Sequence, residues 1–507
     1  MREELINRRD FLKLLGLLSL TMLPVPERKV ERKKIPGQDL PNILILVFDS
    51  LSATNMSLYG YPRQTTPHIQ QAAEKGTVFH RHYAGGNFTV PGTASLLTGT
   101  YPWSHRAINL NGIVIDSFED RNIFRELNST HHTFAYTHNT LTNLQLHQFR
   151  EGIDQLYKRS ELSLLSNHYT DGLLQDDFIA ASLAEELILW NQNAPPSSSL
   201  ISRLDRSKRH YSEILLNQKY SHQFPRGIPN STILYFTLEQ AIDWIQAQVK
   251  EQPKPFFGYI HLLPPHYPYN TRQDFVDLFN DGWSPKDKPE SIFSEGRQTS
   301  QTPGLRRQYD EFVAYVDAEF GRLFSFLESS HALEDTQLIL TSDHGEMFER
   351  GIWFHNTPTL YEPVVKIPLI IWNPRQAQRK DVYHPTSCVD ILPTLLKTAG
   401  KTAPEWCEGE AISTANSQVN TRDRSIFVIE AKENPVNTPL NRATVALIKG
   451  DYKLTHYFGY EQKQDFFELF NIAEDPEELV NLYESHPSRA RSLKNELLEV
   501  LADKTNL

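Results

Sequence analysis

Three residues in the chain have the types and positions of metal ligands. Asp49 ends the apolar run "PNILILVFDS", and Asp343 with His344 ends a second apolar run, "TQLILTSDHG". A carboxylate at the end of a buried strand is costly unless it meets water, a partner or a metal. Together, two carboxylates and an imidazole at one sheet edge suit manganese, zinc, magnesium or calcium. Taken singly, each aspartate also fits a helix cap or an ion-pair partner.

A threonine lies at the predicted start of a helix in "NFTVPGTASLLTGTYP", residues 87–102. A helix N-terminus attracts anions because its first backbone N–H groups are free. The hydroxyl of Thr89 is therefore a candidate fourth metal ligand. It is also a candidate nucleophile, since a catalytic metal lowers the pKa of bound water to about 7 and coordination could activate a hydroxyl similarly. The alternative is that Thr89 only caps its helix.

The elements that must position these residues alternate between strands and helices. Continuous apolar runs, typical of strands buried on both faces, recur at "PNILILVF", "PFFGYIHLL", "TQLILTS" and "IPLIIW". Between them lie helical patterns, such as the apolar spacing from Tyr309 to Leu327. This alternation predicts an α/β fold with a mostly parallel central sheet and helices on both faces. In such sheets, sites form at the carboxyl ends of the strands.

The composition changes along the chain predict three parts. Residues 1–35 form a signal or anchor with a charged linker, residues 36–400 a catalytic domain, and residues 401–507 a small C-terminal α+β subdomain. An insertion at about 150–230 is predicted because "NAPPSSSL" and "FPRGIPNS" interrupt the regular pattern. In the C-terminal part, "TVALIKGDYKLTHY" predicts a hairpin that turns at its Gly-Asp pair.

The N-terminus resembles an export signal. In "NRRDFLKLLGLLSLTMLPV", Arg8 and Arg9 precede an apolar run from Leu14 to Leu23. The run is shorter than the roughly 20 apolar residues that span a bilayer. Paired arginines before such a run are typical of the twin-arginine translocase route, so we expect an exported protein of the periplasm or cell envelope. No obvious small-x-small cleavage site follows, which leaves open whether the segment remains as a membrane anchor; a buried helix with a basic start is the alternative.

The net charge argues against one class of partner, and the number of cysteines argues against two classes of fold. The 507 residues include 51 Lys and Arg against 62 Asp and Glu, a net charge of -11, which argues against nucleic acid as a partner. A basic run within residues 203–209 is the local exception, and we interpret it as a solvated helix face. Cys388 and Cys407 are too few for a disulfide scaffold or a zinc ribbon, and whether they pair stays open.

Seven stretches resemble, in order, motifs of the sulfatase family of the alkaline phosphatase superfamily, and they span about residues 41–485. They are "PNILILVFDSLSATNMSLYGYPRQTTPHI", "TVPGTASLLTGTYP", "HYPY", "TSDHGEMFERGIWFH", "TLYEPVVKIPLIIWNP", "VDILPTLLKTAG" and "FELFNIAEDPEELVNL". The resemblance implies an alkaline-phosphatase-like α/β sandwich with a small C-terminal subdomain. It also implies an ester hydrolase or transferase.

The resemblance assigns roles to individual residues. Asp49, Asp343 and His344 match metal ligands of the family, and Thr89 matches its nucleophile, which would also bind the metal. The implied cofactor is one divalent ion.

The resemblance also assigns roles to two histidines, and a third is judged from its place in a strand. His266 in "PPHYPY" and His355 in "FHNTPTLYE" resemble the histidines that contact the transferred group or the leaving oxygen. For His266 the alternative is a ring packed among its neighbouring tyrosines and proline. His261 lies inside a predicted strand, and we expect it to be a structural core histidine.

Three positions depart from the family pattern, and two of them, Thr89 and Thr93, favour phosphorus chemistry. Sulfatases convert the cysteine of a CxPxR stretch to formylglycine, whereas this chain has Thr89 and Thr93 at the cysteine and arginine positions. Ser50 replaces the second aspartate of the usual pair. Thr89 resembles instead the nucleophile of phosphoglycerol and phosphoethanolamine transferases, which use a divalent metal, often manganese.

We therefore expect a metal-dependent hydrolase or transferase that acts on a phosphate or sulfate ester through Thr89, with the phosphoester and manganese favoured. The expected substrate is a small-molecule, glycan or lipid-head-group ester. Two alternatives stay open: a sulfatase that works without formylglycine, and a non-catalytic binding protein on the same fold.

Overall fold

The structure is a computed structural model of the chain. It describes residues 40–110, 112–165, 200–231, 234–294, 302–412, 424–461, 463 and 465–505. The predicted export signal, residues 1–35, lies outside the described residues. Within the described ranges, no helix combines the length and the apolar character needed to cross a bilayer.

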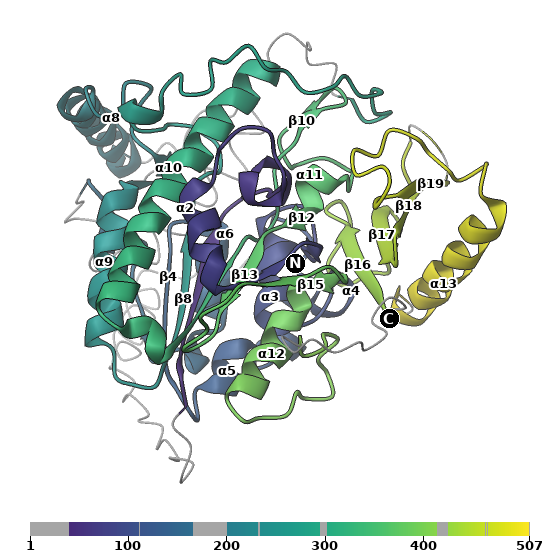
Figure 1. The fold of residues 1–507 in the computed structure, drawn as a ribbon, viewed down its shortest axis with the longest axis horizontal. Coiled ribbons are helices and arrows are strands. Elements are labelled where there is room, and N and C mark those ends of the chain that lie inside the picture. Colours follow the sequence, from purple (N-terminus) through teal and green to yellow (C-terminus); the bar gives the residue numbers. More distant parts are fainter. Residues whose placement is uncertain are drawn as a thin grey trace, which may run out of the picture.

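An eight-stranded sheet forms the centre of the molecule (Figure 1). In sheet order its strands are β14 (Lys380–Val382), β2 (Thr77–Phe79), β13 (Leu369–Trp372), β9 (Thr336–Thr341), β1 (Asn42–Phe48), β8 (Phe256–Leu262), β4 (His132–Thr137) and β5 (Gln155–Leu156). Neighbours from β9 to β5 pair in parallel, whereas β13 is antiparallel to both of its neighbours. The predicted mostly parallel sheet is therefore confirmed.

Side chains of β1 alternate between two apolar cores, one on each face of the sheet. Ile43 and Ile45 belong to one core, and Leu44 and Leu46 belong to the other; all four are fully buried. A strand buried on both faces needs helices on both.

Helices supply this cover on each face (Figure 1). One face carries α2 (Pro67–Ala72), α9 (Leu238–Glu251) and α10 (Thr302–Ser329). The other carries α3 (Thr89–Thr98), α5 (Ile123–Leu127), α6 (Thr140–Gln148) and α12 (Ile391–Thr398). The sandwich expected from the sequence is thus the observed architecture.

Shorter elements surround the central sheet. Small sheets are formed by β12 (Lys366–Ile367), β3 (His82–Tyr83) and β15 (Thr386–Ser387), by β10 (Phe348–Glu349) and β11 (Ile352–Trp353), and by β6 (Asn230–Ser231) and β7 (Leu234–Tyr235). In the described ranges of this part, the remaining α-helices are α4 (Pro102–His105), α8 (Leu200–Tyr220) and α11 (Glu362–Val365). The basic run within residues 203–209 lies on α8.

The C-terminal part is a second, antiparallel sheet covered by one helix. The sheet contains β16 (Ser425–Glu430), β17 (Ala443–Lys449), β18 (Tyr452–Phe458) and β19 (Phe466–Asn471), and the helix is α13 (Pro487–Thr505). The predicted hairpin is confirmed, since β17 and β18 pair antiparallel about Gly450 and Asp451. Gly450 has a φ of 57°, which glycine adopts without steric cost. Figure 1 shows this sheet and α13 on the opposite side of the molecule from α9 and α10.

The two cysteines are free thiols. Cys388 is fully buried, and Cys407 is partly buried. Burial raises the pKa of the Cys388 thiol to about 12, which keeps it protonated and unreactive. The structure thus answers the open question of pairing in the negative.

Candidate active site

Four neighbouring parallel strands bring polar residues to one edge of the central sheet. Asp49 follows β1, Asp343 follows β9, Asn139 follows β4, and His261 is the penultimate residue of β8. Because β9, β1, β8 and β4 are consecutive in the sheet and parallel, their carboxyl ends lie side by side. The structure therefore brings the residues that follow β1 and β9 to one edge of the sheet, together with residues from β8 and β4.

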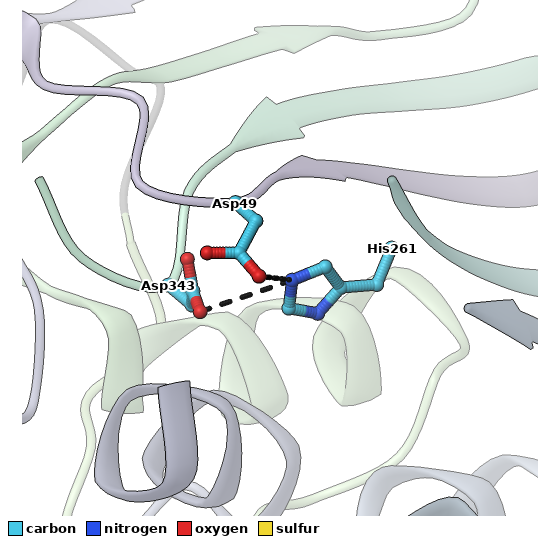
Figure 2. A group of neighbouring side chains, drawn as sticks. All are labelled: Asp49, His261 and Asp343. Carbon is cyan, nitrogen blue, oxygen red and sulfur yellow. Dashed lines mark ion pairs between the residues drawn. The ribbon is translucent and has the colours of Figure 1, made fainter. Parts of the chain in front are cut away.

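Asp49, His261 and Asp343 form a buried cluster with the character of a cation site (Figure 2). His261 Nε2 lies 3.4 Å from Asp49 Oδ2 and 3.8 Å from Asp343 Oδ2. Within the described part of the chain, Asp49 Oδ1, Asp343 Oδ2 and His261 Nε2 make no hydrogen bond. Buried polar atoms without partners are costly. Two carboxylates and an imidazole facing one another fit a divalent cation.

His261 was expected to be a structural core histidine, and that expectation is incomplete. The ring is fully buried, as expected, but one nitrogen faces the two carboxylates. Its other nitrogen, Nδ1, lies 3.2 Å from Thr142 Oγ1 and 3.1 Å from Tyr259 Oη. The signal in the sequence was a histidine within the last residues of an apolar run, near the strand end at which Asp49 also lies.

His344 joins the same cluster. Its Nε2 atom lies 3.4 Å from Asp49 Oδ1 and 3.4 Å from Asp343 Oδ2. Its Nδ1–H donates to the Gly345 carbonyl at 2.9 Å, so in the neutral ring Nε2 carries the lone pair that a metal needs. Burial would raise the pKa of Asp49, but nearby histidines, His266 first among them, lower it to about 2. Asp49 is therefore a carboxylate at neutral pH.

Thr89 is the first residue of α3, and its side chain does not cap the helix. The N-cap residue is Phe88, and no side-chain capping bond is present. Thr89 Oγ1 lies 3.4 Å from His344 Nε2 and 3.4 Å from Asn139 Nδ2. The hydroxyl therefore belongs to the polar cluster, and the capping alternative is wrong.

Gly92 allows α3 to lie close to the cluster. A Cβ atom at this position would lie 2.2 Å from the carbonyl oxygen of Asp343, a clash with backbone that cannot move aside cheaply. A glycine one turn after Thr89 is thus required for the close approach of α3 to the end of β9.

Asn139 was missed by the sequence analysis. Its Oδ1 accepts from the backbone N–H groups of Leu141 and Thr142, which caps α6. Its Nδ2 donates to Asp49 Oδ2 at 2.6 Å and also lies near Thr89. The available signal was an asparagine directly after "HTFAYTH", a stretch whose threonine and aromatic residues favour a strand, at the point where that strand gives way to a helix.

Ser50 and Thr93 occupy two of the three positions that depart from the family pattern; Thr89 occupies the third. Ser50 has a φ of 54°, an uncommon conformation for a residue with a side chain, and its N–H donates to Asp343 Oδ1 at 3.1 Å. Its backbone therefore holds one of the cluster carboxylates. Thr93 lies fully buried within α3.

His355 pairs with a glutamate beside the cluster. Its Nδ1 lies 3.1 Å from Glu346 Oε1, and its ring centroid lies 4.1 Å from that of His344. Glu346 Oε2 accepts from the Tyr269 hydroxyl at 3.2 Å. Burial raises the pKa of Glu346 well above its usual range, and burial followed by neighbouring cations lowers the pKa of His355 well below its own. The pair therefore holds a neutral imidazole next to a protonated carboxyl group.

His266 lies next to His355 at the rim. The two ring centroids are 5.1 Å apart, and the His266 ring also makes an edge contact with Phe354 at 5.3 Å. Its Nδ1–H donates to the carbonyl of Tyr267 at 2.7 Å. The structure thus brings His266 and His355, the two histidines matched to the family, next to each other, with His266 packed on Phe354.

Two family models match this chain, and together they span the residues of the candidate site. The family model described as Sulfatase matches residues 41–401, and the one described as N-sulphoglucosamine sulphohydrolase, C-terminal, matches residues 349–506. A choline-sulfatase of Rhizobium meliloti (strain 1021) is 24% identical over 477 residues, which cover 88% of this chain and 83% of that protein. Arylsulfatase K of Canis lupus familiaris is 22% identical over 530 residues, covering 96% of this chain and 88% of that protein.

Solved structures share the fold at lower identity. The phosphonate monoester hydrolase of Agrobacterium radiobacter superposes with a TM-score of 0.61 at 18% identity, covering 92% of this chain and 96% of that chain. A protein solved in complex with its substrate D-glucosamine-2-N, 6-O-disulfate superposes with a TM-score of 0.64 at 17% identity, covering 92% of this chain and 98% of that chain. The Sulfatase match includes the whole cluster around Asp49 and Thr89. The chain therefore belongs to the sulfatase family of ester hydrolases.

Proposed function

We propose that this sulfatase-family hydrolase cleaves or transfers a phosphate or sulfate ester group through Thr89, with the phosphoester favoured. The observation that carries the proposal is the position of the Thr89 hydroxyl. It does not cap α3, and it lies 3.4 Å from His344 Nε2 in a cluster where one oxygen of each carboxylate, Asp49 Oδ1 and Asp343 Oδ2, has no hydrogen-bond partner among the described residues. A non-catalytic binding protein would have no need for such costly buried atoms.

One divalent cation would be held by Asp49, Asp343, His344 and His261, with the Thr89 hydroxyl as a further ligand. When bound, the cation supplies positive charge that favours ionisation of a hydroxyl and neutralises the ester oxygens. The mixed set of carboxylates and imidazoles fits manganese, zinc, magnesium or calcium, and manganese is favoured because Thr89 resembles the nucleophile of phosphoglycerol and phosphoethanolamine transferases, which often use it.

Side chains of this protein supply both the nucleophile and the acid that protonates the leaving oxygen. Thr89 Oγ1 gives its proton to a water molecule of the solvent and forms a bond to the phosphorus or sulfur atom, while the bond from that atom to the leaving oxygen breaks. His355 is placed to protonate that oxygen from Nε2, because its Nδ1 faces the carboxyl group of Glu346, which replaces the proton. His266, next to His355, orients the ester oxygens. Water or a second hydroxyl then releases the group from Thr89.

The preference for phosphorus follows from charge. A phosphate monoester carries up to two negative charges near neutral pH because its second pKa is about 6, whereas a sulfate ester carries one. Thr93 supplies no positive charge where the family pattern has an arginine, so charge stabilisation depends on the cation. The second candidate, a sulfatase that works without formylglycine, is favoured by the curated relatives, which are named as sulfatases.

A substrate panel tests the proposal. Phosphate and sulfate mono- and diesters are assayed with chelated protein and after addition of manganese. Thr89→Ala should abolish turnover and Thr89→Ser should keep part of it, and protein quenched during turnover should carry a phosphoryl group on the Thr89 peptide. Thr98→Ala, at the other end of α3, is the matched control and should remain active. Faster cleavage of sulfate esters than of every phosphate ester, or an active Thr89→Ala variant, contradicts the mechanism.

We also propose export through the twin-arginine translocase, on the basis of Arg8 and Arg9 before the apolar run. Replacing both arginines by lysine should retain the protein inside the cell. Unchanged export of that double variant would refute the proposal. The substrate would then be an ester of a small molecule, a glycan or a lipid head group outside the cytoplasm.

A further inference from the structure

The C-terminal sheet places a lysine at the rim of the candidate site. The backbone N–H of Ile429, in β16, donates to the Gly85 carbonyl at 3.0 Å. The end of β16 therefore runs beside the segment that leads into α3. Lys432 follows two residues after β16 ends.

The ammonium group of Lys432 contacts the neighbours of two site residues. Its Nζ lies 5.3 Å from the ring centroid of Phe88, which directly precedes Thr89. The same Nζ donates to the side-chain oxygen of Asn356, which directly follows His355. Lys432 thus lies between the segment that carries the proposed nucleophile and the segment that carries the proposed acid.

The charge of Lys432 is only partly compensated. Its amide partner, Asn356, is neutral, and no ion pair of Lys432 is found among the described residues. The nearby carboxyl group of Glu430 is engaged elsewhere, since Oε2 accepts from the Tyr460 hydroxyl at 2.7 Å and Oε1 from the Lys432 backbone N–H at 3.0 Å. Burial lowers the pKa of Lys432, and the carboxylates of Glu430 and Glu433 offset only part of this effect. A half-buried ammonium with a neutral partner gains from meeting an anion.

We propose that Lys432 binds a second anionic group of the substrate, separate from the ester that reacts at Thr89. The ester group itself is directed to the cluster of Asp49, Asp343 and His344. The natural substrate is accordingly an ester whose leaving group carries another sulfate, phosphate or carboxylate. This inference rests on the proposed function for the position of the reacting ester.

Equilibrium binding tests this inference without turnover of the ester. Full-length Thr89→Ala protein with manganese is titrated with glucose 6-phosphate and glucose 1,6-bisphosphate, and with glucosamine 6-sulfate and its 2-N,6-O-disulfate. Each doubly substituted probe should bind about ten-fold more tightly than its partner, the effect of one charge-assisted hydrogen bond. Adding Lys432→Met should abolish this preference, and adding Lys432→Arg should keep most of it.

Lys250→Met provides the matched control. The Lys250 ammonium also lies over an aromatic ring, 4.8 Å from the centroid of Phe326, but at the end of α9, close to the residues that enter β8 at the opposite sheet edge. This variant should keep the preference. Thermal unfolding verifies that each variant is folded, and Lys432→Gln replaces Lys432→Met if the latter is not.

Two outcomes overturn the inference: no preference in the parent protein, or an unchanged preference without the lysine. Failure of the proposed function is recognised separately. It appears in the turnover panel of the wild-type protein, whereas these titrations measure binding without turnover.

Discussion

The side-chain amide of Asn139 donates to Asp49 Oδ2 at 2.6 Å, so the residue that caps α6 also orients the carboxylate at the end of β1. The other oxygen, Asp49 Oδ1, faces His344 Nε2 at 3.4 Å. One residue thus couples the start of a helix to the geometry of the candidate metal ligands. Hydrogen bonds of this kind tune metal affinity because they hold a ligand in its binding orientation.

The first prediction separates the two contacts of Asn139. Asn139→Ser should keep α6 capped, because serine is a good N-cap residue, but it removes the donor to Asp49. We expect manganese affinity to fall roughly 10- to 100-fold with little change in thermal stability. Asn139→Ala should lose the same affinity and, in addition, about 1 kcal/mol of stability. Metal titration and thermal unfolding of the two variants measure these effects; wild-type affinity in Asn139→Ser would rule out the orienting role.

The second prediction concerns metal content. Wild-type protein should bind one divalent cation per chain, measured by elemental analysis after dialysis. Asp343→Ala should lose the metal and the activity together, because it removes one of the two carboxylates. His261→Ala should weaken metal binding, whereas His331→Ala, at an exposed site, should not. Two tightly bound ions in the wild type, or full occupancy in Asp343→Ala, would contradict a single site at these residues.

The third prediction addresses the pair formed by His355 and Glu346. Glu346→Gln keeps the shape of the side chain but cannot replace the proton that His355 gives to the leaving oxygen. We expect kcat to fall roughly 100-fold with KM nearly unchanged for esters of poor leaving groups. Nitrophenyl esters should lose much less, since their leaving oxygen needs no proton. An equal loss for both kinds of ester would indicate a structural role of Glu346 only.

The fourth prediction concerns stability in acid. His105 is fully buried; its Nδ1 accepts from the Ala107 N–H at 3.1 Å, and its Nε2 lies 3.0 Å from Ser95 Oγ. Burial, reinforced by Arg106, lowers its pKa from 6.5 to about 3. Between pH 6.5 and about pH 3, His105 is therefore protonated in the unfolded chain but neutral in the folded chain. This stabilisation is complete above pH 6.5 and is lost as the pH falls towards 3.

The slope of this loss identifies His105. One proton taken up on unfolding lowers the free energy of unfolding by about 1.4 kcal/mol per pH unit. We expect His105→Gln to be less stable than the wild type in urea at pH 7. Between pH 7 and pH 5, its free energy of unfolding should fall with decreasing pH less steeply than that of the wild type, by about that amount. His331→Gln, at an exposed site, serves as the control and should keep the wild-type slope. If His105→Gln also keeps the wild-type slope, the buried neutral imidazole of His105 does not cause the loss of stability in acid.

Local patterns determined the main outline of the protein. Apolar runs that end in acids identified β1 and β9 with Asp49 and Asp343, and the helix that begins at Thr89 was predicted from the same short stretch. The hairpin between β17 and β18 followed from its turn residues. These features depend on residues close together in the chain, so hydrophobic periodicity and turn chemistry suffice to predict them.

Only the tertiary structure decided which residues share the site. His261 and Asn139 enter it because β8 lies next to β1 and β4 lies next to β8, and pairing between strands far apart in the chain leaves no local pattern. Packing also decides that the Thr89 side chain does not cap α3 and that Lys432 lies over Phe88, next to Thr89. Contacts of this kind are selected by the burial of the whole sheet between two layers of helices, a free energy summed over the entire core and not carried by any single segment.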